Sequence, residues 1–143
     1  MSLKRVSNWR TRLDQIISSA QELDFEWGSF DCVLHVCNCI RAITVSGTDP
    51  ALNHRGKYST EAEAVAIFGS SLQNFIATEA AALGMPEVPV TLARRGDVVF
   101  IDNSTPQGAV GIVSTDGRYA SCVGSKGHVL VTIHRWRRAW QVG

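Results

Sequence analysis

The stretch Met85-Pro86-Glu87-Val88-Pro89 divides the sequence into two parts of different character. Two prolines within five residues interrupt regular backbone pairing, so this segment is predicted to connect elements rather than to form one. The chain before it carries apolar residues at helical spacing, and the chain after it carries short β-type runs separated by turn residues. Helices followed by strands predict an α+β fold, in which helices pack on an antiparallel sheet within a single domain, residues 1–143.

The N-terminal part contains the helical patterns. Apolar spacings of three and four predict helices over residues 8–23, 32–43, 60–68 and 72–83. Thr60 followed by Glu63 is a capping-box pattern, which marks the start of the third helix. Residues 46–58, which include Gly47, are predicted to be irregular because glycine and proline punctuate them.

The C-terminal part contains the β-type runs. They cover residues 97–101, 109–114, 119–123 and 128–134, with a final strand near Trp140 and Val142. In the fourth run Val129, Val131 and Ile133 alternate with their neighbours, which predicts one buried face. The segment 135–140 interleaves arginines with tryptophans and is interpreted as a solvated strand end with a tryptophan in the core, rather than as a base-stacking surface.

Composition excludes several classes of protein. The chain has 143 residues, of which 45% are hydrophobic, so it is not a disordered or low-complexity segment. Its formal net charge of +1 argues against a nucleic-acid partner, which would favour a clear basic excess. No apolar run reaches the roughly 18–20 residues of a membrane span, and the N-terminus lacks the apolar core of a secretion signal. The four cysteines are therefore expected to be reduced thiols of a cytoplasmic protein.

Cys32 occupies a position suited to a nucleophile. It is predicted in the first turn of a helix, where backbone N–H groups and the helix dipole lower the pKa of a thiol. Such a cysteine also needs a base from elsewhere in the fold, and His35 is disfavoured because it lies beside Cys32 on the same helix. The remaining histidines are His54, His128 and His134. The alternative is a buried thiol that packs as a small hydrophobe.

A zinc site is a second alternative. Three residues lie near one face of the predicted helix and two more could complete a site: Cys32, His35 and Cys39, with Cys122 or His128. However, the Cys-x-x-Cys pair that is typical of zinc sites does not occur in the sequence. We therefore predict no metal and no cofactor, and we interpret Cys37, Cys39 and Cys122 as core residues.

Three motifs resemble those of the NlpC superfamily, papain-like cysteine peptidases that cut cell-wall peptides. Phe25-Glu26-Trp27-Gly28-Ser29-Phe30-Asp31-Cys32 is similar to the nucleophile segment, in which Asp-Cys begins a helix. Arg95-Gly96-Asp97-Val98-Val99-Phe100 and Ala109-Val110-Gly111-Ile112-Val113 are similar to the first two core strands. The whole chain also resembles a group of small phage and prophage proteins of unknown function, through Gly47-Thr48-Asp49-Pro50, Arg55-Gly56-Lys57-Tyr58 and Ala139-Trp140-Gln141-Val142 as well.

The resemblance implies a papain-like fold in which Cys32 faces the sheet. Binding residues are expected among the matched motifs, at Trp27, Asp31, Arg95 and Asp97. The position of the catalytic histidine is occupied by Ala109, and that of the third polar residue by Ala120 or Ser121. Loss of the base normally costs several orders of magnitude in rate, so the resemblance implies a catalytically degenerate protein.

The expected role is in a phage or prophage tail, through contacts with other tail proteins or with cell-wall peptides. Such a protein would be cytoplasmic during assembly and could then be incorporated in the virion tail. The alternative is an active cysteine amidase or endopeptidase that cleaves peptidoglycan stem peptides. In that case Cys32 attacks the peptide and His128, or as a second choice His134, serves as the base.

Overall fold

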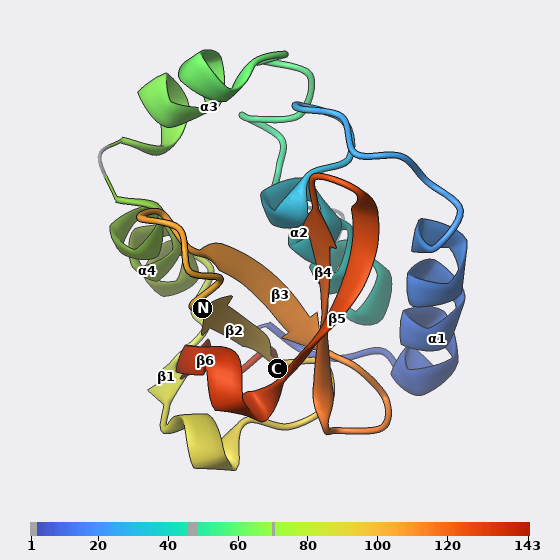
Figure 1. The fold of residues 1–143 in the computed structure, drawn as a ribbon. Coiled ribbons are helices and arrows are strands. Elements are labelled where there is room, and N and C mark those ends of the chain that lie inside the picture. The colour runs from blue at the N-terminus through green and yellow to red at the C-terminus, as the bar shows by residue number, and fades with distance from the viewer. Residues whose placement is uncertain (1–2, 46–48, 70) are drawn as a thin grey trace.

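The computed structural model describes residues 3–45, 49–69 and 71–143, and it confirms the α+β class (Figure 1). Within these ranges the helices are α1 (Trp9–Ala20), α2 (Cys32–Ile43), α3 (Glu61–Phe68) and α4 (Leu72–Ala82), with two short 3-10 helices, η1 (Val90–Leu92) and η2 (Ile133–Arg135). The strands are β1 (Glu87–Val88), β2 (Val98–Ile101), β3 (Ala109–Val113), β4 (Tyr119–Gly124), β5 (Gly127–Thr132) and β6 (Trp136–Trp140). They form one sheet in the order β1-β6-β2-β3-β4-β5, and every neighbouring pair is antiparallel. Gly47 and Thr48 of the quoted motifs lie outside the described residues.

Three of the four predicted helix starts are confirmed by side-chain caps. The Thr60 hydroxyl accepts from the backbone N–H of Glu63 at 3.2 Å, while the Glu63 carboxylate accepts from the N–H of Ser59 at 3.0 Å. Asp31 caps α2 and Ser71 caps α4 in the same way. These bonds satisfy N–H groups that have no partner within the helix, which explains where α2, α3 and α4 begin. The Asn8 side chain, at the start of α1, makes no such bond.

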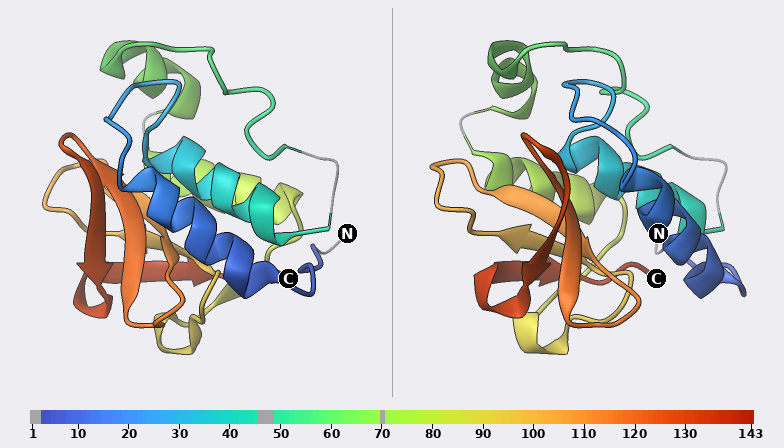
Figure 2. Two further views of the ribbon diagram at one scale, coloured as in Figure 1. Left: turned by 90° about the vertical axis from the view of Figure 1, so that its right-hand side faces the viewer. Right: turned by 45° about the vertical axis from the view of Figure 1, so that its right-hand side comes forward.

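Three helices cover one face of the sheet, and Figure 2 shows α3 lying apart from it. The core on this face joins α1, α2 and α4 to alternate residues of the strands, among them Val98, Phe100, Val110 and Ile112. The opposite face is also buried, through Val99, Ile101, Ala120 and Trp136, although the helices do not lie on it. The sheet must therefore curl so that its second face packs on itself and on the segment around η1. No helix in the described part of the chain is long and apolar enough to cross a membrane.

Two sequence predictions about the strands are corrected. The proline-flanked connector contains β1, which pairs with β6 through Glu87 and Trp140. This is possible because β1 is an edge strand, where proline interrupts no second ladder. The predicted buried face of the fourth run is wrong, since Val129 is 40% and Ile133 is 42% exposed. β5 is the other edge strand of the sheet. The core ends at β4, so most side chains of β5 stay partly or fully exposed.

Candidate functional site

Cys32 is the first residue of α2, directly after a loop held by the Asp31 carboxylate. This carboxylate accepts hydrogen bonds from the backbone N–H groups of Gly28 and Leu34, both at 3.0 Å, and from the Tyr58 hydroxyl at 2.5 Å. Asp31 is almost fully buried. Its carboxylate oxygens hydrogen-bond to the loop, to the start of α2 and to the segment that carries Tyr58. The predicted binding residue Asp31 is thus engaged in positioning Cys32 rather than exposed to a ligand.

The thiol of Cys32 lies where β3 and β4 separate. The two strands pair only at Ile112 with Ser121 and at Val113 with Ala120, and Figure 1 shows them diverging beyond this point. Cys32 contacts the core on both sides of the sheet, as the resemblance implied for a thiol facing the sheet.

Two thiols reach the backbone of Val110 in this gap. The Cys122 thiol donates to the carbonyl of Val110 with a sulfur–oxygen distance of 3.3 Å. Hydrogen bonding from the Val110 backbone also reaches the Cys32 thiol. Val110 has no pairing partner in β4, and the two cysteine side chains take the place of that partner. Such contacts are needed because a buried backbone group without a hydrogen bond is costly.

Burial raises the pKa of the Cys32 thiol to about 11, and the nearby Asp31 carboxylate acts in the same direction. Hydrogen bonding from the backbone of Val110 and Val33 lowers this pKa, but it does not offset the loss of solvent around the sulfur. The residue as a whole keeps partial surface exposure, so it is the sulfur, not the entire residue, that is withdrawn. The lowered pKa predicted from the helix start is wrong for this reason.

Ala109, which the motif comparison set against a catalytic histidine, is a core residue. Ala109 is buried in the cluster on the curled face of the sheet, together with Cys122 and Ala120. Cys39 is also fully buried, whereas Cys37 keeps partial exposure and lines a cavity of about 40 Å³ together with His54. The interpretation of Cys39 and Cys122 as core residues is therefore confirmed.

Two histidines are joined through one hydroxyl. The Nε2 atom of His35 lies 2.8 Å from the Ser121 Oγ atom, and the Nε2 atom of His128 lies 2.6 Å from the same oxygen. Because a hydroxyl has one proton, it donates to one ring and accepts from the other. Among the described residues, no hydrogen bond joins Cys32 to either histidine. The structure thus brings His35, Ser121 and His128 together beside α2, without linking them to the thiol.

The other two histidines are placed elsewhere. His134 lies in η2, beyond the end of β5 that is opposite to His128. Five residues lie between the two histidines, and four of them, 129–132, are in β5, so the two rings belong to opposite ends of this strand. His54 lies with its ring against Phe68 and Phe75, and its Nε2 atom is 3.9 Å from a Glu79 carboxylate oxygen.

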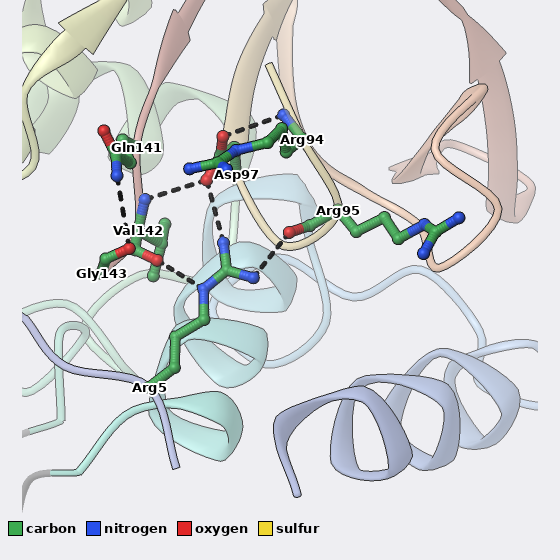
Figure 3. Close-up of polar contacts among 7 residues, drawn as sticks. All are labelled: Arg5, Arg94, Arg95, Asp97, Gln141, Val142 and Gly143. Atoms are coloured by element: carbon green, nitrogen blue, oxygen red, sulfur yellow. Dashed lines mark hydrogen bonds and ion pairs between the residues drawn. The ribbon is translucent and has the colours of Figure 1, made fainter. Parts of the chain in front are cut away.

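The remaining predicted binding residues have different environments. Trp27 packs edge-on against Phe25, with ring centroids 4.8 Å apart, and is partly exposed. Asp97 is buried in an ion pair with Arg5 (Figure 3). Arg95 exposes its side chain, and its backbone carbonyl accepts from Arg5 at 2.7 Å.

The zinc alternative finds no support in the geometry. The Sγ atom of Cys39 lies 3.9 Å from the Nε2 atom of His35, which is already bonded to Ser121. Across residues 3–45, 49–69 and 71–143, no group of three histidine, cysteine or acidic side chains could hold a metal ion.

Acid is expected to destabilise the protein through His35. This ring is 1% exposed, and burial lowers its pKa from 6.5 to about 4, with repulsion from His128 adding to the effect. At a pH between the unfolded pKa of 6.5 and the folded pKa of about 4, the unfolded chain binds more protons than the folded one. The free energy of unfolding therefore falls as the pH falls through this range. We expect a loss of about 2 kcal/mol between pH 7.5 and pH 5. Urea unfolding at both pH values measures it, and His35→Gln should remove most of the dependence; an unchanged dependence would contradict the assignment.

A protein-family model described as a domain of unknown function (DUF6950) matches residues 4–142. The match includes both the helix start at Cys32 and the ion pair between Arg5 and Asp97, so it spans both parts of the fold. Its description states neither an activity nor a partner. A comparison with curated proteins gives no significant match.

Proposed function

Because the chain belongs to the DUF6950 family, whose description names no activity, we propose a function from the geometry around Cys32 and from the motifs. The protein is a papain-like, NlpC-type protein without peptidase activity, and it acts through protein contacts in a phage or prophage tail. One observation carries the loss of activity: the Cys32 thiol is enclosed between β3 and β4, with its pKa raised to about 11. The tail role rests on the resemblance of the motifs alone.

Peptidase chemistry needs a thiolate and a group that protonates the leaving amine. With its pKa raised to about 11, the Cys32 thiol is almost entirely protonated at pH 7. His35 and His128 share the hydroxyl of Ser121, and Ala109 carries no base. These contacts favour a structural role for the thiol, in which it fills the gap between the strands and meets the Val110 backbone.

Cys32 is expected to react slowly with iodoacetamide. At pH 6 to 8 its alkylation, followed by site-resolved mass spectrometry, should be at least about tenfold slower than that of glutathione, because alkylation requires the thiolate. The same measurement after urea unfolding is the control, and the difference should disappear. Labelling of the folded protein at pH 6 faster than glutathione would show an activated nucleophile and would support the alternative hydrolase.

The tail role is tested in a phage that encodes this protein. Deletion of the gene should abolish infectious particles with complete tails in electron micrographs, and a copy carrying Cys32→Ala should restore them. Restoration by the wild type but not by Cys32→Ala, together with hydrolysis of stem peptides by the wild type alone, would replace this proposal by the active amidase or endopeptidase. Normal tails after deletion would overturn the tail role itself.

A further inference from the structure

A second pocket lies away from Cys32, at the start of α1. It has a volume of about 480 Å³ and lies between the beginning of α1, the loop before β2 and the C-terminal residues. Its lining includes Arg5, Trp9, Arg10, Arg94, Arg95 and Gly117. The loop before β2 is tied to Val113 at the end of β3, through the backbone N–H of Gly96 at 2.8 Å. Cys32 faces Val110 near the other end of that strand, so the two sites are separate.

Arg5 lines this pocket and is held by the hydrogen bonds and the ion pair that Figure 3 shows. Its guanidinium donates to the Val142 carbonyl at 2.6 Å, to the Arg95 carbonyl at 2.7 Å and to an Asp97 carboxylate oxygen at 3.0 Å. Trp9 supports this arrangement, because the Arg5 guanidinium carbon lies 4.2 Å from the centre of its ring. These contacts hold one arginine rigidly and show that a carboxylate is accepted at this place.

The other three arginines of the pocket form no ion pair with a described side-chain carboxylate. Arg10 lies over the Trp9 ring at 4.6 Å, and Figure 3 shows Arg95 extending away from Asp97. Arg10, Arg94 and Arg95 are exposed, and in the described ranges no hydrogen bond or ion pair engages their guanidinium groups. Arg94 and Arg10 repel Arg5 and contribute to lowering its pKa, an effect that burial dominates and that Asp97 opposes. Four guanidinium groups therefore meet a single side-chain carboxylate.

We propose that this pocket binds an acidic segment of a partner protein, through two or more aspartate or glutamate carboxylates. Guanidinium groups bind carboxylates through charge-assisted hydrogen bonds, which are often paired. Within the pocket Arg5 makes one such bond to Asp97, and elsewhere in the chain Arg138 makes two to Glu87. Carboxylates are favoured over a nucleic-acid backbone because the net charge of the chain is only +1, whereas nucleic-acid binders carry a clear basic excess. The proposal does not depend on the function proposed above.

The test is fluorescence anisotropy of the full chain with fluorescein-labelled hexaglutamate at low ionic strength. Hexaglutamine is the neutral probe, and an oligothymidylate of matched charge is the phosphate probe. The double variant Arg94→Gln, Arg95→Gln removes two exposed charges and leaves the backbone contacts of both residues intact. The matched control is Lys126→Gln, Arg135→Gln, which removes two charges from the β4–β5 turn and from η2.

We expect hexaglutamate to bind the wild type and the control alike, and the Arg94, Arg95 variant at least about tenfold more weakly. Added salt should weaken binding, because the contacts are exposed. Three results would each overturn the proposal: hexaglutamate binding no better than hexaglutamine, equal affinity of the two double variants, or tighter binding of the oligothymidylate than of hexaglutamate.

Discussion

Replacing Asp97 with alanine is expected to lower the free energy of unfolding by about 3–5 kcal/mol, the usual cost of removing one partner of a buried ion pair. Asp97 is 1% exposed, and its carboxylate accepts from Arg5 at 3.0 Å. It also accepts from the backbone N–H groups of Arg94 at 2.9 Å and of Val142 at 3.1 Å. The substitution leaves a partly buried guanidinium and two N–H groups without their acceptor. Urea denaturation at pH 7 measures the loss.

Asp102→Ala is the matched control for this experiment. The Asp102 side chain is 46% exposed and lies 3.5 Å from Arg137, so its loss should cost less than about 1 kcal/mol. Asp97→Asn should give an intermediate loss, because the amide oxygen can still accept from one backbone N–H although the charge is gone. Equal losses for the two alanine variants would show that the cluster around Arg5 does not hold the first and last described segments to β2.

The helices could be predicted from the sequence because the signals that define them are local. Asp31, the residue before α2, caps the helix through a bond from the N–H of Leu34, only three residues away. The predicted range 32–43 matches the helix. The predicted end of the first helix at residue 23 is three residues beyond Ala20, because it relied on the apolar Leu23. That side chain is 51% exposed, so it gains nothing from a longer helix.

The chemistry of the candidate site could not be predicted in the same way. The sequence places Cys32 correctly at a helix start, and a helix start alone favours the thiolate. The sign of the pKa shift is set instead by burial between β3 and β4, strands that lie far along the chain. The contact of His35 with Ser121 spans 86 residues, and it depends on strand register and on helix packing together.

The role of Arg5 could not be predicted from the sequence, because its partner Asp97 lies 92 residues away and no local pattern indicates the ion pair. The quoted motif around Asp97 did contain a usable clue. An aspartate directly before an apolar strand can accept from the backbone of its own turn, as Asp97 does from Arg94. The papain-like relationship stays a prediction from the motifs, while the order of helices and strands follows from the sequence and is confirmed.

Gly28→Ala is expected to destabilise the protein by about 3–5 kcal/mol, more than most single substitutions do. Gly28 has φ of +78°, a backbone conformation that disfavours side chains. A Cβ atom there would lie 1.8 Å from the Tyr58 carbonyl oxygen, a distance that requires backbone to move. The movement is opposed by two hydrogen bonds, from the Gly28 N–H to Asp31 at 3.0 Å and from the Gly56 N–H to the Gly28 carbonyl at 2.9 Å.

Gly56→Ala separates the two causes of this loss. Gly56 has φ of +72°, close to that of Gly28, but an added Cβ atom meets nothing within 4 Å. It should therefore cost only about 1–2 kcal/mol, the usual cost of a left-handed conformation in a residue with a side chain. Thermal and urea unfolding of both variants measure the difference.

The same pair of variants tests how the loop protects Cys32. If Gly28→Ala forces the loop away from Tyr58, the Asp31 cap should loosen and the thiol should become more accessible. Alkylation of Cys32 should then be faster in Gly28→Ala than in Gly56→Ala, under conditions where both remain folded. Equal stability losses and equal alkylation rates would mean that the loop can leave Tyr58 without cost. The enclosure of the thiol would then depend on β3 and β4 alone.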